Sequence, residues 1–156
     1  APTQAVDPLG LYIVEFDEGS DCMTLTGRKD CLARLSAMYA DETLWNNTAG
    51  GRSRGNGPTN GNWGGKCWSG GQHSCGPGGQ MGTAAPLDSA DEAYRRHDTC
   101  YAAAGTNQQG IAICDRAVVN ELRALDHDPR RWPRPPRPGT EGDSRRFRDM
   151  TILWFR

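Results

Sequence analysis

Two stretches in the second half of the chain carry the pattern of amphipathic helices. Residues 90–104 contain no Gly or Pro, capping side chains precede them at 86–89, and Gly105 follows as a stop signal. From about residue 109 to 125, apolar side chains recur at steps of seven, four and three. Because only a short turn separates the two stretches, we predict two antiparallel helices. The apolar face of the second consists of Ile111, Val118, Leu122 and Leu125.

Outside this pair the pattern is weaker. Residues 11–16 and 150–155 are short runs rich in β-branched and aromatic side chains, and we predict two strands there, paired in a small terminal sheet. Residues 30–43 have apolar positions at helical spacing, with Asp30 as N-cap. Residues 46–87 are dense in Gly, Asn and Ser and predict a long loop. The five prolines of 128–143 predict an extended segment that wraps or links.

Composition limits the fold to one small, loop-rich domain. The chain has 156 residues, of which 36% are hydrophobic, with 20 Gly and 10 Pro. Its six cysteines form no CxxC pair, so the pattern favours up to three disulfides in an oxidising compartment. The chain begins at Ala1 without Met and has no apolar run near the roughly 20 residues of a membrane span. We therefore expect a mature, secreted, monomeric protein.

Charge is distributed unevenly along the chain. Residues 1–127 hold 10 basic and 15 acidic side chains, whereas residues 128–156 hold 8 Arg and 4 acidic residues. A basic tail on an acidic body suits binding to nucleic acid or anionic lipid. The simpler interpretation is that Arg keeps a Pro-rich segment soluble, so we expect no nucleic-acid partner.

The first predicted helix carries a histidine beside an aspartate. His97 and Tyr101 are four residues apart and share a face, whereas Asp98 is displaced by about 100°. On the second helix, Asp115 directly follows Cys114, and a disulfide from Cys114 to the first helix would bring Asp115 near His97. An imidazole supported by a carboxylate can take a proton from water near neutral pH.

A glycine-rich turn upstream offers oxygen ligands for a metal. In Ser74-Cys75-Gly76-Pro77-Gly78-Gly79 the glycines allow several backbone carbonyls to converge. Ca²⁺ takes about 6–8 oxygen ligands, carbonyls included. We therefore expect a calcium site between this turn and the Asp98 carboxylate, where the ion could stabilise an oxyanion.

Three motifs in order resemble the secreted, calcium-dependent phospholipase A2 superfamily. They are Cys-Gly-Pro-Gly-Gly at 75–79, the element that runs from Asp91 through His97-Asp98 to Cys100-Tyr101, and Cys114-Asp115-Arg116. The resemblance covers roughly residues 74–125, flanked by an N-terminal extension (1–66) and an Arg/Pro-rich C-terminal segment (128–156). It implies a mainly α fold in which two antiparallel, disulfide-linked helices carry the active site.

The resemblance also implies a role for each residue. His97 would activate the attacking water, Asp115 would orient His97, and Tyr101 would hydrogen-bond Asp115. The Asp98 carboxylate and the carbonyls of Ser74, Gly76 and Gly78 would bind Ca²⁺. The implied reaction is hydrolysis of the sn-2 ester of a glycerophospholipid at a membrane surface or micelle. The alternative is a phospholipase A2-like binding or toxin protein with weak or no activity.

The chain also departs from the family pattern. Ala93 and Tyr94 stand where many members have adjacent cysteines, so Cys75 needs another partner. Cys67 is the nearest candidate, but the four remaining cysteines allow three connectivities. Tyr94 is expected in the core. Two tryptophans of the long loop, Trp63 and Trp68, suit either a lipid interface or a cover for the core.

Overall fold

The computed structural model describes residues 59–155. The predicted strand at 11–16 and the predicted helix at 30–43 lie outside these residues. The elements of the described part are mainly helical, with a small antiparallel sheet. None of its helices combines the length and the apolar character that crossing a membrane requires.

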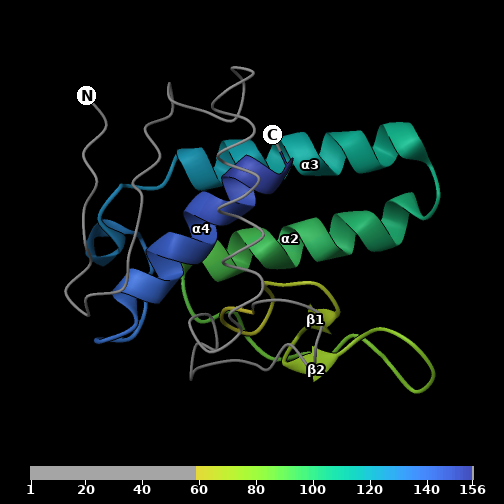
Figure 1. The fold of residues 1–156 in the computed structure, drawn as a ribbon, viewed down its shortest axis with the longest axis horizontal. Helices are drawn as coiled ribbons and strands as arrows, with labels where there is room; N and C mark the ends of the chain where they lie inside the picture. The colour runs from red at the N-terminus through yellow and green to blue at the C-terminus, as the bar shows by residue number, and fades with distance from the viewer. Residues whose placement is uncertain (1–58, 156) are drawn as a thin grey trace, which may run out of the picture.

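The two predicted helices are present and antiparallel. Helix α2 (Ser89–Ala104) and helix α3 (Gln108–Arg123) run side by side in opposite directions (Figure 1). At the start of α2, the Asp88 carboxylate accepts from the Asp91 amide, and Asn107 caps α3 by accepting from Gly110. At the end of α2, Gly105 adopts φ +59° and its amide donates to the Tyr101 carbonyl.

A cystine links the two helices. The Cys100–Cys114 disulfide joins α2 to α3 with the Cα atoms 5.7 Å apart. A second disulfide joins Cys67 to Cys75, which confirms the nearest-neighbour pairing among the connectivities that the sequence allows. Both bonds fit the prediction of a disulfide-stabilised domain.

The described part of the long loop contains only one short hairpin. Strand β1 (Trp68–Ser69) pairs antiparallel with β2 (Gln72–His73). Trp63 and Trp68 are both buried, and their indole N–H groups donate to the carbonyls of Ala84 and Gly61. In this structure the two tryptophans therefore pack within the domain, as the second of the two sequence interpretations proposed.

The Pro-rich segment wraps around the first turn of α2. After the 3-10 helix η2 (Pro129–Arg131), Trp132 is buried and donates to the Asp126 carbonyl. The Ser89 amide donates to the carbonyl of Arg134, and the Arg134 amide donates to the Ser89 hydroxyl. The guanidinium of Arg134 forms an ion pair with Glu92. The chain wraps as predicted up to residue 140, but residues 141–143, which the prediction included, are the start of the last helix.

The prediction of a strand at 150–155 is wrong. These residues are the end of helix α4 (Glu141–Phe155). A short run of mostly apolar residues cannot distinguish strand from helix by its period, and here packing decides, because residues 146–153 are all buried. Phe147 packs edge-on against Tyr94 of α2, and the Thr151 hydroxyl donates to the Phe147 carbonyl within the helix. Residues 150–155 therefore form no terminal sheet.

A side chain of helix α4 also caps the C-terminus of α3. The Arg148 guanidinium is buried and donates to the carbonyls of Leu122 and Leu125, which lie at the C-terminus of α3. Tyr94 lies in the core, as expected. The main core cluster is formed by side chains from the loop and from all three helices: Trp63, Ala90, Ala93, Tyr94, Val118, Val119, Leu122, Trp132, Phe147, Met150, Ile152 and Leu153.

Candidate active site

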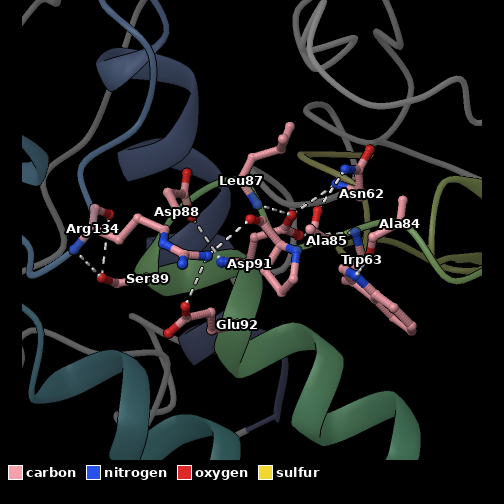
Figure 2. A network of polar contacts seen from close by, with 11 residues as sticks. Asn62, Trp63, Ala84, Ala85, Leu87, Asp88, Ser89, Asp91, Glu92 and Arg134 are labelled. Atoms are coloured by element: carbon pink, nitrogen blue, oxygen red, sulfur yellow. Dashed lines mark hydrogen bonds and ion pairs between the residues drawn. The ribbon is translucent and has the colours of Figure 1, made fainter.

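A buried carboxylate attaches the loop before β1 to the first turn of α2 (Figure 2). Asp91 is fully buried and accepts three backbone amide bonds, from Asn62, Trp63 and Leu87, at 2.8–2.9 Å. Burial raises the pKa of Asp91 to about 6, and the amide bonds oppose this shift by favouring the charged form. At Gly61, φ is +64° and a Cβ atom would lie 2.6 Å from this carboxylate. The close approach of loop and helix therefore requires glycine.

Between one and two turns further along α2, beside α3, are the residues of the predicted active site. The His97 Nε2 atom lies 2.9 Å from Asp115 Oδ1, and the Tyr101 hydroxyl donates to the same oxygen. His97 and Tyr101 come from α2 and Asp115 from α3, and the Cys100–Cys114 disulfide joins the helices within this group. The structure therefore brings together all three residues that were predicted as catalytic.

The two nitrogens of the His97 imidazole have different surroundings. Asp115 contacts Nε2, so a proton on Nε2 would donate to the carboxylate and leave Nδ1 as a base. The His97 side chain is 8% exposed, compared with 25% for Asp115. The pKa of Tyr101 is raised by burial and then by its hydrogen bond to Asp115 and the charge of that carboxylate. The tyrosine therefore stays neutral and can donate to Asp115.

An aromatic residue that the sequence analysis did not select also contacts this group. The ring of Phe155, at the end of α4, has its centroid 4.6 Å from that of His97. It also meets Tyr101 edge-on, with centroids 6.5 Å apart. Sequence reasoning missed Phe155 because it assigned this residue to a strand. One signal in the sequence could have predicted its position. Phe147, Thr151 and Phe155 are spaced four residues apart, which places them on one face of a helix.

Asp98 lies on a neighbouring face of α2 and reaches the hairpin. Its carboxylate accepts a hydrogen bond from the Ser69 hydroxyl at 2.7 Å. Burial raises the pKa of Asp98 to about 7, the Ser69 bond opposes this shift, and the nearby charge of Asp91 adds to it. A half-buried carboxylate of this kind gains from a nearby cation, which favours its charged form.

The remaining predicted calcium ligands belong to the turn at 74–79. This turn follows β2, and in Figure 1 the chain after β2 extends beyond the two short strands. Its contacts are local: the Ser74 amide donates to the Cys67 carbonyl, and the Gly79 amide donates to the Gly76 carbonyl. A Cβ atom at Gly76 or Gly78 would meet no atom within 4 Å. In the described structure, Asp98 is hydrogen-bonded to Ser69 of β1 and not to this turn.

Comparison with known proteins found no match among protein-family models, curated proteins or solved structures. The assignment of a function therefore depends on the residues and geometry described above.

Proposed function

We propose that the chain is a hydrolase that cleaves the sn-2 ester of glycerophospholipids to a fatty acid and a lysophospholipid. One observation carries the proposal, namely the convergence of His97, Tyr101 and Asp115 from two disulfide-linked helices. A buried imidazole with a carboxylate on one nitrogen is an arrangement suited to general-base activation of water. The substrate class follows from the resemblance of the three motifs to secreted phospholipase A2.

In the proposed mechanism, Asp115 accepts a hydrogen bond from Nε2–H of His97 and so holds the imidazole in one tautomer and orientation. Nδ1 takes a proton from the water that attacks the ester carbonyl, and Asp115 stabilises the imidazolium that forms. The imidazolium then returns the proton to the leaving alcohol oxygen. Positioned general-base catalysis of this kind contributes about 10²–10⁴-fold to a rate. The Tyr101 hydroxyl holds the carboxylate in place.

Calcium dependence is part of the proposal, and the Asp98 carboxylate and the carbonyls of Ser74, Gly76 and Gly78 are the groups that would hold the ion. Asp98 lies beside His97 in the sequence, and burial raises the pKa of its carboxyl to about 7, so a bound cation would favour its charged form. We assign no catalytic step to the ion. The two disulfides of the described part suit the oxidising conditions outside the cell, where we propose that the protein acts.

The proposal is tested by measuring fatty-acid release from phospholipid vesicles in millimolar calcium and in EGTA. We expect release that requires calcium and that is lost in His97→Gln. The matched control is His127→Gln, because His127 is an exposed histidine beyond the end of α3. Wild-type protein that binds vesicles but releases no fatty acid would favour the alternative, a binding or toxin protein of the same fold.

A further inference from the structure

The end of α4 lies against the proposed catalytic histidine. Phe155 and His97 have ring centroids 4.6 Å apart with an interplanar angle of 56°, and Tyr101 is 4.2 Å from His97 by the same measure. The three rings therefore form one aromatic cluster around the imidazole. Two of its members belong to the motif on α2, while Phe155 comes from a helix that lies outside all three motifs.

His97 lies on the buried face of α2, in line with Ala90, Ala93 and Tyr94. The neighbours Arg95, Arg96 and Thr99 are exposed, whereas the His97 side chain is 8% exposed. Its Nε2 atom is fixed by Asp115, but one hydrogen bond leaves the ring free to tilt about that bond. Contacts with the flat faces or edges of two aromatic rings restrict this tilt.

We propose that Phe155 is a positioning residue for His97 and provides the apolar surface beside the imidazole on which the acyl chain of the ester packs. The proposal rests on the proposed function for the acyl-chain contact, but the positioning of the imidazole does not depend on turnover. Phe155 is itself only partly buried, and it lies at the edge of the main core cluster. An aromatic ring offers a large apolar area at low entropic cost, which suits binding of a hydrocarbon chain.

The positioning is tested first without any substrate. Diethyl pyrocarbonate modifies accessible, unprotonated imidazoles, and peptide mass spectrometry gives the rate at each of the three histidines of the chain. Phe155→Ala should raise the rate at His97 several-fold and leave the rates at His73 and His127 unchanged. Trp154→Ala is the matched control, because Trp154 is adjacent on α4 and 56% exposed. An unchanged rate at His97 in Phe155→Ala would overturn the proposal.

The acyl-chain contact is tested by steady-state kinetics on phospholipids with short and long acyl chains. Phe155→Ala should lower kcat by about tenfold, because a slightly misplaced base loses efficiency. It should also raise KM more for the long chain than for the short one. Phe155→Leu keeps an apolar side chain, so its KM values should lie close to those of the wild-type protein. This variant also replaces Phe155→Ala in the test if the alanine variant folds poorly. Equal changes of KM for both chain lengths would contradict the acyl-chain contact.

The two experiments separate failure of this inference from failure of the proposed function. If the wild-type protein hydrolyses no phospholipid but Phe155→Ala exposes His97, the proposed function is wrong and the positioning stands. If the wild-type protein is active and Phe155→Ala changes neither the modification rate nor the kinetics, the inference alone is wrong.

Discussion

His97 Nε2 and Asp115 Oδ1 lie 2.9 Å apart although the residues are 18 positions apart and on different helices. The Tyr101 hydroxyl donates to the same carboxylate oxygen, so Asp115 is held by two partners from α2. The proposed chemistry depends on these two contacts of Asp115, and each contact can be removed by a separate substitution.

Asp115→Asn should keep the fold and remove most of the activity. The amide has no charge with which to stabilise an imidazolium, and it permits the wrong tautomer of His97. Loss of the carboxylate partner of a catalytic histidine costs on the order of 10⁴-fold in kcat. Asp126→Asn is the control, because Asp126 is an exposed carboxylate in the turn beyond α3. Near wild-type kcat in Asp115→Asn would show that this residue does not support His97.

Tyr101→Phe should have a smaller effect than Asp115→Asn. It removes one hydrogen bond to the carboxylate and leaves the aromatic contact with His97 in place. A hydrogen bond to a charged group contributes about 1.5–3 kcal/mol, so we expect a fall in kcat of roughly 10- to 100-fold. The measurement is kcat at saturating substrate for both variants and for the double variant. Strictly additive effects would argue against a shared role of the two residues.

Removal of the Cys100–Cys114 disulfide should affect both stability and activity. The bond closes a loop with a sequence separation of 14 residues, which predicts a loss of about 3 kcal/mol in the free energy of unfolding. The Cys100→Ala, Cys114→Ala double variant can be compared with Cys67→Ala, Cys75→Ala, whose loop has a separation of 8. Urea unfolding gives the stabilities, and activity is measured under conditions where both variants are folded. The first should then lose more activity, since its bond joins the two helices that carry His97, Tyr101 and Asp115.

Asp91 should make stability depend on pH in mildly acidic solution. Its pKa is about 6 in the folded protein, compared with 3.8 as the ordinary value, so the folded state binds more protons between these two values. This contribution to the free energy of unfolding is complete below about pH 4 and is lost as the pH rises through 6. Urea unfolding across this range should show that the free energy of unfolding falls less steeply with rising pH in Asp91→Asn than in the wild-type protein. An equally steep fall in the variant would show that other carboxyl groups cause the pH dependence.

Asp91→Asn should also destabilise the protein at every pH. Asn has one side-chain acceptor oxygen, whereas the carboxylate accepts three amide bonds with its two oxygens. A buried amide N–H that is left without a partner costs about 1–3 kcal/mol. The matched control is Asp128→Asn, since Asp128 lies at the surface, where it caps η2 and forms an ion pair with Arg130.

Calcium binding can be measured by isothermal titration calorimetry without turnover. We expect binding to be lost in Asp98→Asn. Ser69→Ala should change the affinity, because the Ser69 hydroxyl is the hydrogen-bond partner of Asp98. Gly76 and Gly78 have φ values of +74° and +77°, so the Gly76→Ala, Gly78→Ala double variant strains the turn without filling a contact. Unchanged affinity in that variant would reject the turn as the source of carbonyl ligands.

The sequence predicted α2, α3 and the contacts among His97, Tyr101 and Asp115 because their signals are local. Asp88, Gly105 and Asn107 mark the helix ends, and a cystine between consecutive antiparallel helices leaves few possible registers. The i, i+4 relation of His97 to Tyr101 and the position of Asp115 after Cys114 then place the three side chains together.

The sequence did not predict the parts that depend on long-range packing. The run 150–155 is helical because α4 packs on α3 and its phenylalanines contact α2, which no local period reveals. Phe155 was missed for this reason. The contact of Ser69 with Asp98 depends on where a loop of Gly, Asn and Ser folds back, and such a loop has no periodicity.

The most direct test of the account is mass analysis of the products from a phospholipid with different isotopic labels on its two acyl chains, incubated with wild-type protein and with His97→Gln. The account predicts that the wild-type protein releases the sn-2 fatty acid and the matching lysophospholipid, whereas the variant releases neither. Release of the sn-1 chain, or the same products from His97→Gln at the wild-type rate, would contradict it.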